Sequence, residues 1–373
     1  MRHAPALTAL IVLSSGSALA DGSFAGRTRL DLDRPEIQAF VEKTAAAQKM
    51  EPLDVYRLLA KAEPQPKIIE LISKPAEKVS PWYEYRARFM TEQRIAEGAQ
   101  FMQEHRARLE KAHRDTGVAP EYVVAIIGVE TFYGRITGKY RVLDALVTLA
   151  FDYPPRATFF TDELAQFIAL TREEQIDPLT ALGSYAGAMG AGQFMPSSYR
   201  RYAVDGSNDK QRNLFADWDD IIASVANYFK ASGWVTDGPV LSDAVLQPDA
   251  PVTADPGNLT LNETIAGLKA KGVDFDNAAQ PLSTPVLLIP AEQLAGPSYR
   301  VGFKNFEVIT RYNRSIRYAM AVHDLATTIA GRVAAASPPA KETPAKGALA
   351  EGAPAAKTTK LATRSAGSET AAR

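Results

Sequence analysis

The chain has 373 residues, of which 46% are hydrophobic and 23% charged, enough apolar content to bury at least one full core. A formal net charge of −1 provides no basic surface of the kind that phosphate backbones need, so we expect no nucleic-acid partner. The absence of cysteine excludes disulfides, thiol catalysis, cysteine-ligated zinc and a lipid-modified cysteine.

The first twenty residues follow the order of a secretory signal peptide. A basic start at Arg2 precedes an apolar stretch from Ala6 to Leu13, and the segment ends in Ala-Leu-Ala. The stretch is too short to span a bilayer. We therefore expect residues 1–20 to direct export, and the remaining chain to be soluble, without stable membrane insertion.

Helical periodicity dominates the next two hundred residues or so. Apolar residues recur at three- and four-residue spacing from Arg34 to Asp115, which predicts a helical region over residues 21–115. A further helix is predicted to begin at Pro120, where a missing backbone N–H costs nothing, and to stop at Gly134. Two more helices are predicted at residues 161–174 and 218–232.

Glu130 is an acid near the end of an apolar helix, in the stretch Ile-Ile-Gly-Val-Glu-Thr-Phe-Tyr-Gly-Arg of residues 126–135. The negative end of the helix dipole and the apolar neighbours both favour its protonated form. A raised pKa is what a general acid needs to protonate a leaving-group oxygen near neutral pH. On position alone, an ordinary helix-end pair with Arg135 is the commoner explanation.

A glycine-rich run extends from Ser184 to Tyr199. Its glycines lack the G-x-G-x-x-G order and follow no predicted strand, so a phosphate-binding loop is not indicated. Glycine permits close backbone approach, and Ser184 and Gln193 supply hydrogen-bonding groups. The run fits either a surface on which a polymer lies against the main chain or a tight helix-packing turn, and the spacing alone slightly favours the turn.

The acidic segment from Asp205 to Asp220 alternates oxygen-bearing side chains in a way that suits a hard cation such as calcium. Lys210 stands where such loops have glycine, and Ala216 where they have a bidentate glutamate, so a solvated acidic turn is the alternative. The four histidines lie near no other ligand type at metal spacing, so neither a zinc site nor a Ser/His/Asp triad is indicated.

The last third of the chain changes character twice. Between residues 236 and 302, turn residues separate short apolar runs, which predicts a small strand-containing insertion. Helical periodicity returns in residues 303–335. Residues 336–373 are rich in Ala, Pro, Lys and Thr and have few large apolar residues, so we expect a disordered tail.

Four stretches together resemble the lytic murein transglycosylase B family. They are IIGVET at 126–131, GAMGAGQFMPSSY at 187–199, SVANYF at 224–229 and TRYNRS at 310–315. They follow the family's order within residues 85–326, which makes a chance match remote. The resemblance implies a mainly α fold, in which a lysozyme-like helical catalytic core over residues 116–235 is completed by residues 303–335, with an additional helical region and a small strand-containing (α+β) insertion.

The resemblance implies that one acid cleaves the glycan strands of peptidoglycan. Glu130 would protonate the oxygen between N-acetylmuramic acid and N-acetylglucosamine, then act as a base while the C6 hydroxyl attacks C1 to form a 1,6-anhydro sugar. Glycoside hydrolases generally need a second carboxylate. A transglycosylase does not, because its nucleophile is tethered within the substrate. Asp144, the nearest downstream acid, is the alternative partner for Glu130 that the sequence leaves open, but we expect it on a solvated helix face.

The resemblance also assigns residues that line the glycan cleft: Tyr85, Ser184, Gln193, Tyr228, Tyr312, Asn313 and Tyr318. Tyrosine rings pack against sugar rings while their hydroxyls form hydrogen bonds, and Asn313 would hold an acetamide. The family often has two consecutive arginines for the stem peptide's carboxylates. Here Pro155 replaces the first, so that contact rests on Arg156.

The resemblance points to one structural calcium ion in the loop of residues 205–220 and to no organic cofactor. Its ligands would be Asp205, Ser207, Asp209 and Gln211, with Asp220 closing the site, and Lys210 would weaken it.

Peptidoglycan strands are the expected partner, and cell-wall synthesis proteins are further candidates; the expected form is a periplasmic monomer. Two alternatives share the same residues. A muramidase would use water in place of the C6 hydroxyl, and a catalytically inactive scaffold would only bind glycan. The presence of Glu130 together with Ser184, Gln193 and Asn313 argues against the scaffold.

Overall fold

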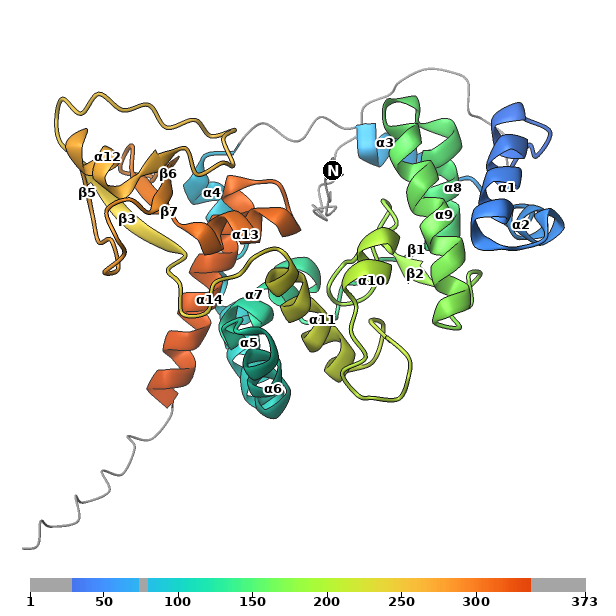
Figure 1. Cartoon of the computed structure of the whole chain (residues 1–373), viewed down its shortest axis with the longest axis horizontal. Coiled ribbons are helices and arrows are strands. Elements are labelled where there is room, and N and C mark those ends of the chain that lie inside the picture. The colour runs from blue at the N-terminus through green and yellow to red at the C-terminus, as the bar shows by residue number, and fades with distance from the viewer. Residues whose placement is uncertain (1–28, 74–79, 337–373) are drawn as a thin grey trace, which may run out of the picture. The chain divides into compact units, whose positions relative to one another are not determined.

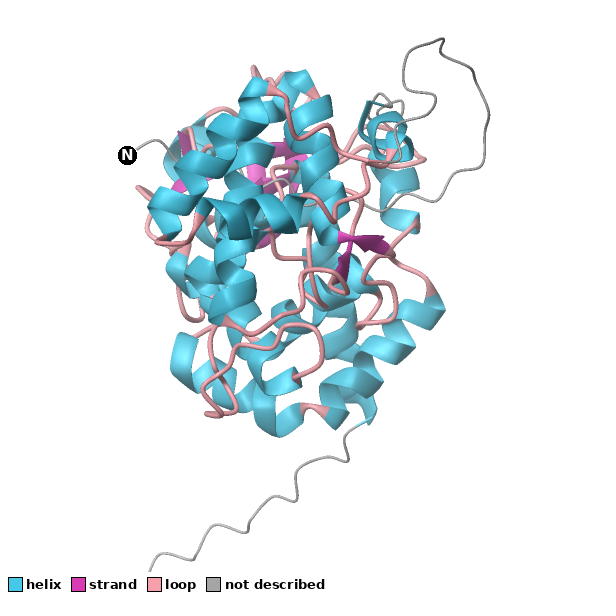
Figure 2. Cartoon of the chain, turned by 90° about the vertical axis from the view of Figure 1, so that its right-hand side faces the viewer, coloured by secondary structure: helices cyan, strands magenta, loops and turns pink. Residues whose placement is uncertain are grey.

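The computed structural model describes residues 29–73 and 80–336, and these residues are mainly helical (Figures 1 and 2). The expected fold class is confirmed, while the proposed boundaries at residues 115, 235 and 302 stay predictions. The expected signal peptide and all of the expected tail except Ala336 lie outside the described residues. In the described part of the chain, no helix is long and apolar enough to cross a membrane.

Three N-terminal helices each have a proline in the first turn, where its fixed φ suits a helix start. They are α1 (Pro35–Gln48), α2 (Pro52–Leu59) and α3 (Pro66–Ser73). They lie with α8 (Val142–Asp152), the short 3₁₀ turn η1 (Pro154–Arg156) and α9 (Ala157–Glu173). Arg34, just before α1, pairs with Asp152 at the end of α8 at 2.7 Å.

Helix α7 (Pro120–Thr131) is buried on almost every side, as expected for a helix that is apolar all round. Its neighbours are α5 (Glu92–Glu104), α6 (Arg106–Thr116), α11 (Trp218–Ala231) and α14 (Ile316–Ala336). The predicted stop at Gly134 is wrong by three residues. The helix ends at Thr131 because Phe132, Tyr133 and Gly134 all take left-handed backbone conformations, with φ of 51°, 60° and 83°.

The glycine-rich run follows a two-stranded antiparallel ribbon of β1 (Tyr140–Arg141) and β2 (Leu182–Gly183), and ends at α10 (Pro196–Tyr202). Gly190 has φ of 68°, and a Cβ there would lie 2.1 Å from the carbonyl oxygen of Leu214. Only glycine therefore lets the run pass this close to the chain that follows it.

A five-stranded antiparallel sheet forms between residues 241 and 302, in the order β4-β6-β7-β3-β5. Its elements are β3 (Leu241–Leu246), β4 (Glu263–Thr264), α12 (Ile265–Ala270), β5 (Val273–Phe275), β6 (Pro285–Pro290) and β7 (Tyr299–Gly302). On β6, Val286 and Leu288 enter the sheet's own core, whereas Leu287 and Ile289 join the main core. This two-residue alternation packs the sheet onto the helices.

Two elements bracket the candidate site. The short helix α4 (Trp82–Ala87) precedes α5, and α13 (Lys304–Tyr312) links β7 to α14. Both α4 and α13 pack against α14, so segments more than 200 residues apart meet beside α7.

Candidate active site

Glu130 is the penultimate residue of α7, and its Oε1 accepts a hydrogen bond of 2.6 Å from the hydroxyl of Tyr318 on α14. Burial raises the pKa of Glu130 to about 8, although the hydrogen bond from Tyr318 acts in the opposite direction. The residue keeps some exposed surface. A carboxyl that is desolvated by dense surroundings but still partly accessible can hold a proton near neutral pH and pass it to a bound molecule.

Arg135 does not neutralise Glu130. It forms an ion pair with Glu97 on α5 at 2.6 Å, so the helix-end pair considered as the alternative is not formed. No charged residue contributes to the pKa shift of Glu130, whose only causes are burial and Tyr318. Among the described residues, Glu130 is therefore a carboxyl without an ionic partner.

Three tyrosines from three helices interact with Glu130, one through a hydrogen bond and two electrostatically. Tyr318 lies near the start of α14, Tyr312 ends α13, and Tyr85 belongs to α4. Burial is the main cause of a raised pKa for each hydroxyl, and the charge of Glu130 adds to it in all three. All three tyrosines therefore lie close enough to interact with Glu130, and they remain neutral hydroxyls near neutral pH.

The glycine-rich run is tied to the same place by two side chains. The hydroxyl of Tyr312 donates to the carbonyl oxygen of Gly192 at 2.5 Å, and Thr131 Oγ1 donates to that of Ala191 at 2.8 Å. Sequence reasoning missed Thr131. Its signal was a hydroxyl placed directly after the acid at the end of an apolar helix.

Gln193 and Ser184 are both buried in the run itself. Gln193 Nε2 donates to the carbonyl oxygens of Thr137 at 3.0 Å and Gly190 at 3.1 Å, and its Oε1 has no partner among the described residues. Ser184 Oγ accepts from the backbone N–H of Ala188 at 3.0 Å. Ser184 therefore shapes the run, whereas Gln193 retains an unused acceptor.

Tyr228 and Asn313 are neighbours of Tyr312. The Tyr228 ring, on α11, lies 4.7 Å from the ring of Tyr312, and its hydroxyl donates to the carbonyl oxygen of Arg311 at 2.7 Å. Asn313 directly follows Tyr312 at the end of α13 and is half-buried. Both residues thus lie at the α11 and α13 side of the tyrosine group.

Arg156 lies apart from these residues in a different set of contacts. It stands at the end of η1, and its guanidinium lies 4.3 Å and 5.0 Å from the ring centroids of Phe159 and Phe160 on α9. Burial against these rings lowers its pKa. The structure therefore places Arg156 on the α9 side of the fold, packed against aromatic rings and not against the Glu130 group.

The expectation that Asp144 lies on a solvated helix face is wrong. Asp144 is only 3% exposed, and Arg141 donates to both of its oxygens at 2.7 Å. The backbone N–H of Glu63 adds a further hydrogen bond of 2.8 Å. Because the segment after α2 covers it, Asp144 joins α8 to that segment and is already fully engaged.

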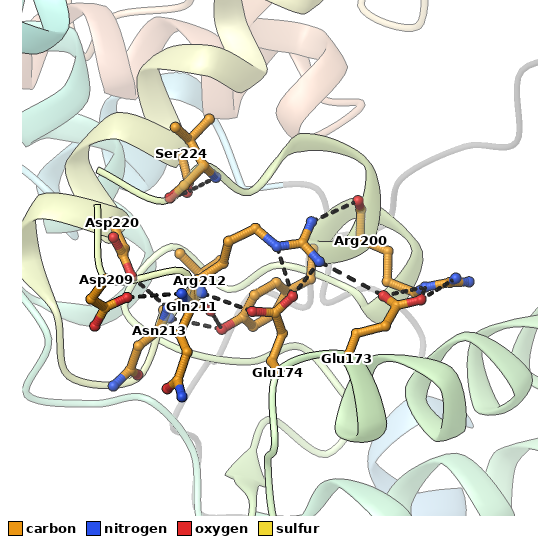
Figure 3. Close-up of polar contacts among 12 residues, drawn as sticks. Glu173, Glu174, Arg200, Asp209, Gln211, Arg212, Asn213, Asp220 and Ser224 are labelled. Carbon is orange, nitrogen blue, oxygen red and sulfur yellow. Dashed lines mark hydrogen bonds and ion pairs between the residues drawn. The ribbon is translucent and has the colours of Figure 1, made fainter. Parts of the chain in front are cut away.

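The acidic loop of residues 205–220 is an ordered turn built around two aspartates. Asp205 accepts hydrogen bonds from the backbone N–H groups of Asn208, Asp209 and Lys210, and Asp220 accepts from those of Gly206, Ser207 and Asn213. Figure 3 shows the contact of Asp220 with Asn213, and Arg212 reaching from the loop to Glu174 at the end of α9. The loop is thus anchored at both ends.

Ser207 Oγ lies at long hydrogen-bonding distance from two carboxylate oxygens of this loop, a spacing that ligands of one cation also have. Ser207 Oγ lies 3.5 Å from Asp205 Oδ1 and 3.4 Å from Asp220 Oδ1. Ligands about 2.4 Å from a calcium ion and at right angles to each other are about 3.4 Å apart. Lys210 has φ of 74°, the left-handed conformation for which such loops use glycine. The donor set therefore fits calcium, although within residues 29–73 and 80–336 no three His, Cys, Asp or Glu residues cluster as metal ligands.

Comparison with known proteins gives matches over most of the chain. The family model of the transglycosylase SLT domain matches residues 33–327. The chain is 39% identical over 311 residues to membrane-bound lytic murein transglycosylase B of Escherichia coli, covering 80% of this chain and 83% of the relative.

Solved structures show the same fold. The catenated lytic transglycosylase SltB1 of Pseudomonas aeruginosa is 44% identical with a TM-score of 0.77, covering 80% of this chain and 98% of that one. Escherichia coli Slt35 in complex with calcium is 39% identical with a TM-score of 0.74, covering 82% and 97%. SltB3 of Pseudomonas aeruginosa, in complex with NAG-anhNAM-pentapeptide, is 27% identical with a TM-score of 0.70, covering 79% of each chain.

Proposed function

The chain belongs to the transglycosylase SLT domain family and is a peptidoglycan lytic transglycosylase, and we propose that Glu130 is its catalytic acid and base. One observation carries this proposal: Glu130 is a carboxyl with a pKa of about 8 whose side chain, among the described residues, has a single hydrogen bond, from a neutral tyrosine. Below about pH 8 it holds the proton that a glycosidic oxygen must receive.

The reaction needs only this one carboxyl. Glu130 gives its proton to the oxygen that leaves with N-acetylglucosamine, and the bond from that oxygen to C1 of N-acetylmuramic acid breaks. The C6 hydroxyl of the same sugar then bonds to C1, and its proton passes to the Glu130 carboxylate. A 1,6-anhydro ring forms and the acid is restored, so no water is consumed and protons balance.

The surroundings of Glu130 support this cycle over hydrolysis by a carboxylate pair. Among the described residues, no ionised group contributes to its raised pKa, which argues against a second carboxylate beside it that would act as a nucleophile or activate water. The C6 hydroxyl is tethered in the substrate and has a high effective concentration without such help. The hydroxyl of Tyr318 stabilises the Glu130 carboxylate while the proton is away.

We further propose that the glycan contacts the tyrosine group and the glycine-rich run. Tyr85, Tyr228 and Tyr312 supply ring faces and hydroxyls for sugars, and Asn313 an amide for an acetamide. The unused Oε1 of Gln193 supports its role as an acceptor for a sugar group. Ser184 acts by holding the run in place, and Arg156 contacts the peptide stem at a distance from the cleavage point.

We propose that the loop of residues 205–220 binds one calcium ion with a structural role. The oxygen ligands would come from Asp205, Ser207, Asp209, Gln211 and Asp220. Gln211 would bind through its backbone carbonyl oxygen, as the seventh residue of such calcium loops does. The left-handed Lys210 and the oxygen spacing support this assignment. The ion would fix the chain between α10 and α11 and take no part in bond cleavage.

We also propose export to the periplasm, supported by the signal-like order of residues 1–20. Sequencing the N-terminus of protein from the periplasmic fraction tests this. A start at Asp21 is expected, and an intact Met1 in protein from the cytoplasmic fraction alone would contradict it.

Digestion of purified peptidoglycan in ¹⁸O-labelled water tests the reaction. The proposal predicts muropeptides with 1,6-anhydro ends that carry no ¹⁸O, because the nucleophile comes from the substrate. Reducing ends that carry ¹⁸O would instead identify a muramidase, and intact strands would identify a protein that only binds glycan.

A further inference from the structure

Asp324 is a buried carboxylate on α14, six residues after Tyr318 and 6% exposed. Its Oδ2 accepts a hydrogen bond of 2.5 Å from Arg86 Nε on α4, and its Oδ1 accepts one of 2.7 Å from Arg300 Nη1 on β7. Two guanidinium groups offset the cost of burying one carboxylate. Asp324 therefore links α14, which carries Tyr318, to the short helix α4 and to strand β7 of the sheet.

Helix α4 depends on these contacts for its position. It has only six residues, too few to be stable alone. Arg300 lies over the Trp82 ring, 5.7 Å from its centroid, and the backbone N–H of Tyr83 donates to the carbonyl oxygen of Glu292 at 3.2 Å. Figure 1 labels α4 beside the sheet, where Arg300 of β7 contacts Trp82. The sheet and α14 together hold α4 against the core.

Arg86, which Asp324 holds, is the neighbour in sequence of Tyr85, a residue of the proposed active site. Tyr85 directly precedes Arg86, and the charge of Glu130 acts on its hydroxyl. The Tyr85 ring also lies 6.2 Å from the Trp82 ring, on which Arg300 rests. Asp324 is thus linked to Tyr85 by two routes, one through Arg86 and one through Arg300 and Trp82.

We propose that Asp324 is a positioning residue for the reaction, which holds Arg86 and Arg300 and thereby fixes Tyr85 beside the Glu130–Tyr318 pair. This inference rests on the proposed role of Glu130. Because α14 carries both Tyr318 and Asp324, the same helix sets the distance of two tyrosines from Glu130, one directly and one through the ion pairs. A shift of about 1 Å in such a group can cost about 100-fold in rate.

The test compares Asp324→Asn with Asp243→Asn. Asp243 is the other acid paired with Arg300, at 3.0 Å, but its side chain is 89% exposed, so its loss leaves α4 in place. We expect Asp324→Asn to lower kcat/KM for anhydro-muropeptide release by about 10-fold to 100-fold. Asp243→Asn should stay within about twofold of the unchanged protein.

A pH profile separates positioning from a general loss of fold. Tyr318 on α14, Tyr312 on α13 and Tyr85 on α4 face Glu130, and all are neutral at working pH. When α4 loosens, water reaches Glu130, so the basic limb of the profile should move to lower pH in Asp324→Asn and stay unchanged in Asp243→Asn. An unmoved limb in a folded Asp324→Asn protein would overturn the proposal.

Arg86→Gln provides the second variant if Asp324→Asn does not fold. If Arg86 acts through Tyr85, the double variant Tyr85→Phe with Arg86→Gln should have nearly the same kcat/KM as the less active of the two single variants. Effects that multiply would overturn the positioning role. If the unchanged protein releases no anhydro products, the proposed function itself fails. If it releases them and Asp324→Asn matches Asp243→Asn, only this inference fails.

Discussion

Two acids of this protein, Glu130 and Asp220, differ in the hydrogen-bond donors that surround them. Burial raises the pKa of both, to about 8 for Glu130. Asp220 accepts three backbone N–H groups that favour its charged form, from the loop it closes. Glu130 has a single tyrosine hydroxyl. The number of N–H donors thus separates an acid that can carry a proton from one that organises a turn.

Glu130→Gln should remove activity almost completely. The amide keeps the size and polarity of the side chain but cannot give up a proton, so we expect kcat for anhydro-muropeptide release to fall by about 1,000-fold or more. Binding of intact glycan strands should change little. A variant that digests purified peptidoglycan at a tenth of the normal rate or faster would show that Glu130 is not the acid.

Asp220→Ala should be the most costly change for the loop. It leaves three backbone N–H groups without an acceptor, and we expect a loss of about 3 kcal/mol in the free energy of unfolding, measured by urea denaturation. Calcium should raise the melting temperature of the unchanged protein but not of this variant.

Asp209→Ala removes a proposed calcium ligand with little loss of the loop's own hydrogen bonds, because Asp209 is exposed and accepts from the backbone N–H of Gln211. We expect it to cost less than about 1 kcal/mol. If the unchanged protein melts at the same temperature with calcium and with a chelator, the loop is held by its own hydrogen bonds alone.

Glu130→Gln should also stabilise the protein at neutral pH. The folded-state pKa of Glu130, about 8, lies above the ordinary value of 4.5. Between these values the folded chain holds a proton that the unfolded chain has lost, so this group makes the folded state less stable as pH rises. The variant should gain up to about 4 kcal/mol at pH 7.5 and nothing below about pH 4.5, by denaturant unfolding at both pH values. A gain that is the same at both would point to packing, not charge.

Tyr318→Phe should have a much smaller effect on catalysis than Glu130→Gln. It removes a hydrogen bond that lowers the pKa of Glu130, so the basic limb of the pH profile should move to higher pH. We expect kcat to fall by about tenfold, because the Glu130 carboxylate loses a stabilising hydrogen bond. A limb that moves to lower pH would mean that water replaces the hydroxyl.

Local patterns predicted the helices around the site well. The apolar run after Pro120 predicted α7, and the expected helices at 161–174 and 218–232 lie within a few residues of α9 and α11. The end of α7 could not be predicted. Phe132 and Tyr133 disfavour left-handed backbone on their own, and contacts such as the hydrogen bond from the Tyr133 hydroxyl to the carbonyl oxygen of Arg94 hold them there.

Long-range partners explain what the sequence could not reveal about the site. Glu130 carried a local signal, an acid in an apolar helix, and its pKa is raised as expected, with burial as the main cause. Asp324 carried none, because Arg86 and Arg300 are 238 and 24 residues away. Asp144 was misplaced for the same reason, since the backbone N–H that covers it belongs to Glu63.

The proton on Glu130 is the central claim, and infrared difference spectroscopy measures it most directly. Spectra of the unchanged protein minus those of Glu130→Gln, taken across the pH range, isolate the carboxyl band of this one residue. The band should change from acid to carboxylate near pH 8. A change near pH 4.5, the ordinary value for glutamate, would contradict the account, because the residue would then hold no proton to give at neutral pH.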